Sequence, residues 1–158
     1  DHGSDLNFLI SVFRKNRDCA FVLFAHPAVL DEKRIIDIKL CRNTLLSVHC
    51  ESGTAGDGLG AVIELLQNHK CFFGVHTYYN DENSTDILNG GFVKRVEKIR
   101  AAFAFLIQSK NCSGQNVSEI KKYIKDGKTN QKYSTFLIDL YEDIDHISRR
   151  ISGGSCQE

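Results

Sequence analysis

Residues 92–109, FVKRVEKIRAAFAFLIQS, decide how the rest of this 158-residue chain is interpreted. Two glycines precede the stretch, and its apolar side chains recur every three or four residues. They are Phe92, Val96, Ile99, Phe103, Leu106 and Ile107. This spacing places side chains on one face of an α-helix. The stretch therefore predicts one amphipathic helix over its whole length.

Other segments with helical spacing favour a mostly α fold. Apolar residues lie three or four apart in 5–16, 28–50, 117–125 and 133–151, and a short helix is expected after the glycine-rich break at 52–60. Two alternatives stay open. Residues 19–25, CAFVLFA, fit a buried strand or a short buried helix, and the alternation at 36–40 fits an edge strand instead of a continuous helix.

The best strand candidate is 71–79, CFFGVHTYY, because it is rich in aromatic and β-branched residues. One strand among several helices makes only a minor β element. The expected fold is therefore mostly α: a compact, disulfide-stapled bundle of five or six helices. The length suits a single globular domain over 1–158.

An even number of cysteines favours a set of disulfides. The six are Cys19, Cys41, Cys50, Cys71, Cys112 and Cys156, and they allow fifteen pairings. Cys41 and Cys50 lie about 13.5 Å apart along a straight helix, which is too far for a bridge. This pair therefore decides whether 28–50 is one helix or a stapled hairpin.

Three Asn-x-Ser/Thr sequons, at Asn83, Asn111 and Asn116, predict surface glycans. Together with the cysteines they favour a secreted, extracellular glycoprotein. The chain starts at Asp1 and has no apolar run of about 18 residues. We therefore expect a mature product whose signal peptide has been removed, or an excised ectodomain, with no membrane span.

Charge is unevenly distributed along a chain whose formal net charge is zero. Residues 92–132 hold ten Lys/Arg and three Asp/Glu, whereas the segments on both sides are acidic. This pattern argues against nucleic acid as the main partner and favours an anionic one, such as an acidic protein surface or a sulfated glycan. The candidate contact residues are Lys94, Lys98, Lys121, Lys122 and Lys125. A solvated basic helix face is the alternative.

Motifs for catalysis or metal binding are incomplete. GTAGDGLG at 53–60 lacks the Lys-Ser/Thr of a phosphate loop, so it is interpreted as a loop between helices. His146 follows Glu142 and Asp143 at helical spacing, but no second histidine completes a zinc site. His76 fits a satisfied core or rim residue, and no G-x-S-x-G motif is present. We therefore expect no catalytic residues, no metal and no cofactor.

The cysteine spacing in CRNTLLSVHC, Cys41 to Cys50, followed by Cys71 and Cys112, resembles the layout of plant invertase and pectin methylesterase inhibitors. The resemblance covers this motif and the helical run 71–151. It implies a secreted helical bundle with an N-terminal disulfide hairpin and a second bridge between core helices. The chain departs from that family in the short interval between Cys50 and Cys71 and in two additional cysteines.

These features favour a non-enzymatic protein that binds another extracellular protein, as a cytokine-like ligand or an inhibitor does. The alternative is an extracellular carrier of a small hydrophobic ligand. In that case, 19–25 and the phenylalanine-rich stripe at 92–107 line the binding surface between helices.

Overall fold

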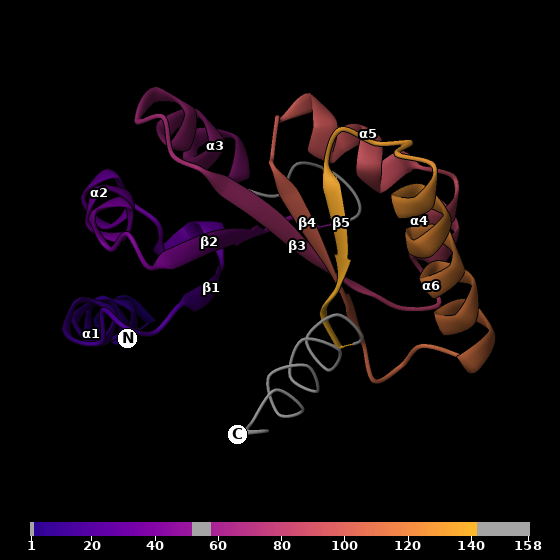
Figure 1. Cartoon of the computed structure of the whole chain (residues 1–158), viewed down its shortest axis with the longest axis horizontal. Helices are drawn as coiled ribbons and strands as arrows, with labels where there is room; N and C mark the ends of the chain where they lie inside the picture. The colour runs from indigo at the N-terminus through magenta and orange to yellow at the C-terminus, as the bar shows by residue number, and fades with distance from the viewer. Residues whose placement is uncertain (1, 52–57, 142–158) are drawn as a thin grey trace, which may run out of the picture.

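Five parallel strands form the centre of the molecule, and helices surround them on the left, top and right of Figure 1, which shows a computed structural model. The structure describes residues 2–51 and 58–141. In chain order the elements are α1 (His2–Lys15), β1 (Phe21–Ala25), a 3-10 turn η1 (Pro27–Val29), α2 (Glu32–Leu40), β2 (Thr44–His49), α3 (Leu59–Asn68), β3 (Phe73–Tyr79), α4 (Ser84–Leu88), α5 (Gly91–Lys98), β4 (Phe103–Gln108), α6 (Gly114–Thr129) and β5 (Phe136–Asp139). The predicted disulfide-stapled helical bundle is therefore wrong.

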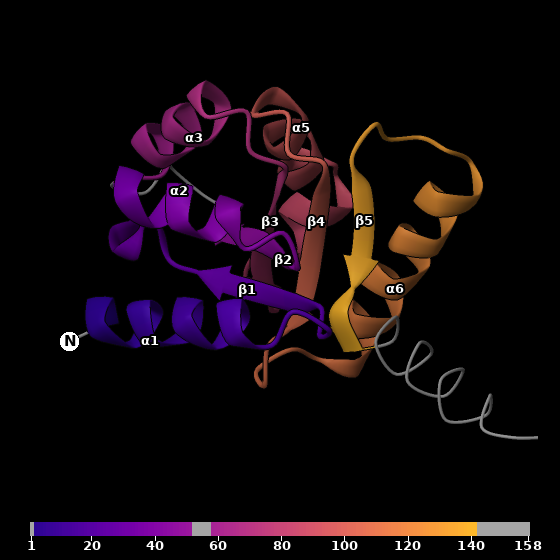
Figure 2. The ribbon, with the colours of Figure 1, turned by 60° about the vertical axis from the view of Figure 1, so that its left-hand side comes forward.

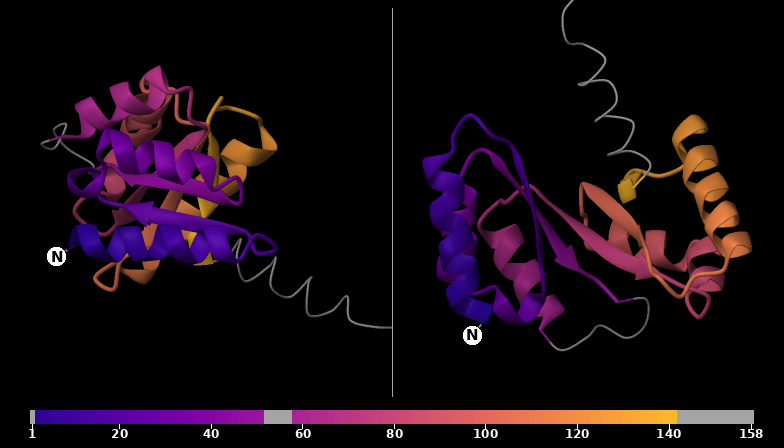
Figure 3. Two further views of the ribbon diagram at one scale, coloured as in Figure 1. Left: turned by 90° about the vertical axis from the view of Figure 1, so that its left-hand side faces the viewer. Right: turned by 90° about the horizontal axis from the view of Figure 1, so that it is seen from below.

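The strands lie in the sheet in the same order as in the chain, β1-β2-β3-β4-β5, and every neighbouring pair is parallel. A connection between adjacent parallel strands is almost always right-handed. Repeated right-handed connections place each connecting helix on the same face of the sheet. Figures 2 and 3 agree with this arrangement, with α1, α2 and α3 beside β1–β3 and α6 beside β5.

The helices and one face of the sheet share a single apolar core. Ile35 on α2, Leu66 on α3 and Val96 on α5 are 1% exposed or less, and they join strand residues Val48 and Val75 in this core. Burial of each such side chain contributes about 1.5–3 kcal/mol to folding. Within the described part of the chain, no helix is both long and apolar enough to cross a membrane, in agreement with the sequence.

The other face of the sheet, which we call the open face, carries every second side chain of the strands. Its members are Val22, Phe24, Leu45, Ser47, His49, Phe72, Gly74, His76, Tyr78, Phe103, Phe105, Ile107, Phe136 and Ile138. A second apolar cluster lies here, centred on Phe103, Phe105 and Ile107. Among the described residues, this cluster contains only strand residues and residues that directly flank a strand.

Aromatic rings converge across the open face. Phe24, Ser47, Gly74 and Phe103 lie in register on β1 to β4. Strands β1 and β4 would be about 14 Å apart in a flat sheet, yet the ring centroids of Phe24 and Phe105 are 5.1 Å apart. The sheet bends toward this face (Figure 3), which brings the rings together. Ser47 and Gly74, the two positions in register between Phe24 and Phe103, also have little or no side chain.

Three predicted helices are wrong because each segment contains a strand. The segment 28–50 divides into α2 and β2, so neither one helix nor a stapled hairpin is correct. The segment 92–109 divides into α5 and β4. The segment 133–151 contains β5, and its residues from 142 onward lie outside the described part. Buried parallel strands are apolar on both faces, so they continue the apolar pattern of the preceding helix.

Helix ends without glycine explain why these divisions are hard to see in the sequence. A left-handed residue commonly ends a helix and is usually glycine. Here Lys70, Arg100 and Gln131 follow α3, α5 and α6 with φ of 51°, 57° and 47°. Each reverses the chain into the next strand without the expected glycine signal.

The remaining expected elements are confirmed. Helix α1 contains the predicted segment 5–16 except for its last residue, and α6 contains the predicted segment 117–125. Helix α3 is the short helix expected after the glycine-rich break. Strand β1 settles the alternative at 19–25 in favour of a buried strand. Strand β3 lies within 71–79, but it is the central strand of the sheet, not a minor element.

The predicted disulfides are also wrong for the described cysteines. The free thiols are Cys19, Cys41, Cys50, Cys71 and Cys112, whereas Cys156 lies outside the described residues. Strand β2 separates Cys41 from Cys50, and its six residues span roughly 20 Å. The hairpin bridge implied by the resemblance to plant invertase and pectin methylesterase inhibitors is therefore excluded, and so is that family's helical bundle.

Substitution of Gly74 by alanine tests the convergence on the open face. A Cβ at this position collides with the ring of Phe103, which is itself only 6% exposed. We expect Gly74→Ala to lower the free energy of unfolding by about 1–3 kcal/mol, as overpacking does. Urea unfolding measures the change.

The matched control is Gly60→Ala in α3, where an added Cβ meets no atom within 4 Å. Alanine is favoured over glycine inside a helix by about 1 kcal/mol, so the control is expected to be neutral or stabilising. Equal stabilities for wild type and Gly74→Ala would contradict the close approach of Phe103 to β3.

Candidate functional site

Three histidines lie where neighbouring strands end. His26 directly follows β1, His49 is the last residue of β2, and His76 lies within β3 in register with His49. Tyr78 is two residues further along β3 and therefore shares the open face with His76. The carboxyl ends of parallel strands meet at one edge of a sheet, and ligands of open α/β folds commonly bind there.

The four rings form one continuous group. The centroids of His26 and His49 are 5.8 Å apart and nearly stacked, and those of His49 and His76 are 5.2 Å apart. Tyr78 lies 5.9 Å from His49 and 6.0 Å from His76. Phe24 meets His76 edge to face at 5.0 Å, which joins the histidines to the apolar cluster of the open face.

Hydrogen bonds differ between the three imidazoles. Nδ1 of His26 accepts from the backbone N–H of Ala28 at 3.2 Å, so a neutral His26 carries its proton on Nε2. Nδ1 of His76 lies 3.1 Å from Oγ of Ser47. Nδ1 of His49 is buried and has no hydrogen-bond partner among the described residues. The Nε2 atom of His26 therefore remains available to a ligand, because this imidazole is exposed.

Burial keeps the imidazoles of His49 and His76 uncharged at neutral pH. Burial, followed by the proximity of His49 and His26, lowers the pKa of His76 to about 4, while its contact with Ser47 opposes the shift only partly. Burial also lowers the pKa of His49, although Glu51 nearby acts in the opposite direction. Each neutral imidazole offers one donor and one acceptor, so the group recognises hydrogen-bonding partners rather than charge.

The contact between Ser47 and His76 has the spacing of a nucleophile and its base, but its environment does not suit catalysis. Ser47 is fully buried and His76 is 3% exposed, so a substrate cannot reach the hydroxyl. A base with a pKa of about 4 also abstracts protons poorly at neutral pH. The contact is better explained as satisfying a buried hydroxyl and imidazole. The expectation of a non-enzymatic protein stays a prediction.

No metal centre occurs in the part of the chain that the structure describes. Across 2–51 and 58–141, no group of three or more His, Cys, Asp or Glu side chains is placed to hold an ion. His26, His49 and His76 contact one another through their rings, with centroids 5.8 and 5.2 Å apart, and do not form such a group. His146, Glu142 and Asp143 lie outside the described residues, as does most of the glycine-rich loop at 53–60.

The five candidate lysines lie on two helices. Lys94 and Lys98 are exposed on α5, and Lys122 and Lys125 are exposed on α6, where Lys121 is half-buried. Both helices cover the outer side of the sheet, away from the open face. Binding of an extracellular protein partner through these lysines stays a prediction.

The sequons lie around α4 and the start of α6. The side-chain amide of Asn83 donates to the carbonyl of Tyr78 at 2.8 Å, and that of Asn116 donates to Asp81 at 2.7 Å. Asn111 is exposed between β4 and α6. Two of the three amides are therefore engaged within the fold, while glycosylation and secretion stay predictions.

A short pattern in the sequence marks the histidine group. The segments LFAH, LSVH and FGVH, which end at His26, His49 and His76, each place a histidine after three apolar or small residues. Interpreting 28–50 as a helix hides the pattern, because it removes the second strand. With three parallel strands recognised, the three histidines fall on one edge of the sheet.

Comparison with protein-family models, with curated proteins and with solved structures finds no match to this chain. The geometry of the site is therefore the basis for inferring its function.

The depressed pKa of His76 predicts that stability falls in mild acid. The unfolded chain binds a proton at His76 near pH 6.5, whereas the folded protein does so only near pH 4. The stabilisation is fully present above about pH 6.5 and is lost as the pH falls toward 4, with a loss of up to about 3 kcal/mol. Urea unfolding at several pH values measures it, and His76→Gln should flatten the dependence over this range.

Proton NMR titration of the His76 ring provides an independent readout. We expect a midpoint near pH 4. A midpoint near 6.5, or an equally steep loss of stability in His76→Gln, would show that this imidazole is not buried in the way described.

Proposed function

We propose that this chain binds a small, planar organic molecule on the open face, beside His26, His49, His76 and Tyr78. One observation carries the proposal: three neutral or exposed histidines and a tyrosine meet at the carboxyl ends of neighbouring strands, on a face that the described helices leave uncovered. This is a form of the ligand-carrier hypothesis, with the ligand on the sheet instead of between helices.

The position of the group supports this proposal. Parallel sheets normally have both faces covered, and ligands of parallel α/β folds bind beyond the carboxyl ends of the strands. Sequential parallel strands with all helices outside also form the (βα)8 barrel, whose sites lie at the same end. The analogy concerns the arrangement of elements, not a family relationship.

The chemistry of the surface supports a planar ligand. Binding sites for small molecules are mostly apolar and aromatic, with a few polar groups that orient the ligand. Tyr78 is 49% exposed, so its ring is available for stacking, and His26 is exposed beside it. The Nε2–H of the exposed His26 supplies an orienting hydrogen bond.

The two segments named for the carrier hypothesis from the sequence meet on this face. Phe24 belongs to 19–25, and Phe105 belongs to the stripe at 92–107; their rings are 5.1 Å apart. They form the apolar floor next to the histidines, since Phe24 also contacts His76. A ligand that stacks on Tyr78 therefore has both an apolar and a hydrogen-bonding neighbour.

The neutral fluorescent probe N-phenyl-1-naphthylamine tests the proposal. We expect saturable, one-to-one binding to the purified protein. The double variant His49→Ala/Tyr78→Ala should bind about tenfold more weakly, because two aromatic contacts of about 0.5–1.5 kcal/mol each are lost. Fluorescence titration measures the affinity, and circular dichroism verifies that the variant is folded.

Phe8→Ala is the matched control, because Phe8 is an exposed aromatic residue on α1, 67% accessible and outside the open face. Its affinity for the probe should equal that of wild type. The proposal fails if wild type shows no saturable binding, or if the control and the double variant weaken binding equally.

A further inference from the structure

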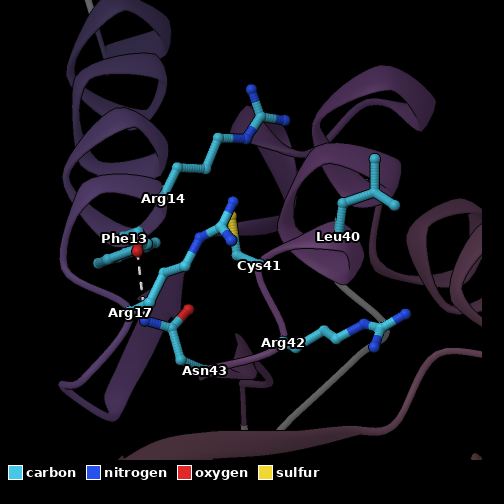
Figure 4. Close-up of a pocket in the computed structure, with 7 residues that line it drawn as sticks. All are labelled: Phe13, Arg14, Arg17, Leu40, Cys41, Arg42 and Asn43. Carbon is cyan, nitrogen blue, oxygen red and sulfur yellow. Dashed lines mark hydrogen bonds between the residues drawn. The ribbon is translucent and has the colours of Figure 1, made fainter.

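A second surface site lies at the opposite end of the sheet from the histidines. A pocket of about 400 Å³ lies between the end of α1 and the connection from α2 to β2. Three arginines, Arg14, Arg17 and Arg42, contribute to its lining, and no carboxylate does. Figure 4 shows the Arg17 side chain extending from the α1 side to Cys41, with Arg14 above it and Arg42, just beyond that cysteine in the chain, pointing away from both.

The charge of the pocket is only partly compensated. Arg14 pairs with Asp37 of α2, which lies outside the lining. Arg17 and Arg42 form no ion pair within the described part of the chain, and both are exposed. Like charges gathered around one pocket repel each other. An anion in the pocket would relieve this repulsion, and the exposed side chains are free to turn onto it.

Capping of α1 does not account for these arginines. Cations near a helix C-terminus can satisfy its last carbonyl groups. Here the side-chain amide of Asn43 lies at 3.2, 3.0 and 2.9 Å from the carbonyl oxygens of Phe13, Asn16 and Cys19 and donates to them. Arg42 also lies on a different element from α1. Asn43 therefore serves the carbonyl group of Phe13 in α1 and those of two residues just beyond the helix.

The same amide holds the walls of the pocket in place. Asn43 directly follows Arg42, and its hydrogen bonds attach this segment to the chain that carries Arg17. Cys41, which is 4% exposed, adds a bond from its thiol to the carbonyl of Asp37 at 3.3 Å. The backbone that bears the guanidinium groups is thus fixed before any ligand arrives, which lowers the ordering cost of binding.

We propose that this pocket binds the phosphate group of a small organic phosphate. Guanidinium groups match phosphate oxygens with paired, charge-assisted hydrogen bonds. Apolar wall comes from Phe13 and from Leu40, which is 66% exposed and is therefore available to the organic part of the ligand. The site lies at the amino ends of the strands and does not depend on the function proposed for the open face.

Phenyl phosphate is the probe for this site, and isothermal titration calorimetry at low salt measures its binding. We expect saturable binding that weakens at least tenfold in the double variant Arg17→Ala/Arg42→Ala. The matched control is Lys110→Ala/Lys132→Ala, which removes two exposed cations that lie outside the pocket and should leave the affinity unchanged. Thermal unfolding verifies that both variants are folded.

Four outcomes would overturn the proposal. The pocket is not a phosphate site if wild type shows no saturable binding of phenyl phosphate, or if both double variants lose affinity equally. If inorganic phosphate binds as tightly as phenyl phosphate, then Phe13 and Leu40 do not contact the organic part of the ligand. Binding to phosphatidylcholine vesicles only when they contain phosphatidic acid, without binding of soluble phenyl phosphate, would assign the phosphate to a lipid headgroup instead of a small molecule.

Discussion

This structure depends on one constraint: strands that follow one another in the chain are also neighbours in the sheet, and the connections between them are right-handed. Because each of the four steps from β1 to β5 joins parallel neighbours, each connecting helix falls on the same side. The other side keeps no helical layer among the described residues, so its side chains pack against one another. The contact of Phe24 on β1 with Phe105 on β4 is the direct consequence.

The two ends of the sheet differ in chemistry. At the carboxyl end, burial keeps the pKa values of His49 and His76 low, so the exposed surface offers aromatic rings and neutral hydrogen-bonding groups. At the amino end, Arg17 and Arg42 stay solvent-exposed and charged near the end of α1, where Asn43 donates to the carbonyl group of Phe13. A planar neutral ligand and a phosphate-bearing ligand therefore suit different ends of one fold, for separate physical reasons.

Part of the fold could be predicted from local pattern alone. Helix α1 follows from its cap and apolar spacing, and β3 follows from its aromatic and β-branched composition. The division of 92–109 could not, because Arg100 ends the helix in a left-handed conformation that sequence rules assign to glycine. The histidine site could not be predicted either, because the three histidines come together only when β1, β2 and β3 are neighbouring strands. Cysteine number likewise predicted bridges, whereas the described cysteines are free thiols and β2 keeps Cys41 apart from Cys50.

The central claim is that β1 and β4, which are separated by two strands, bring their side chains together on an open face. Nuclear Overhauser effects between the ring protons of Phe24 and Phe105, in protein with selectively labelled phenylalanine, measure this contact most directly. The account predicts clear cross-peaks, because the ring centroids are 5.1 Å apart. Absence of these cross-peaks, with cross-peaks from Phe105 to side chains of the helices instead, would contradict it.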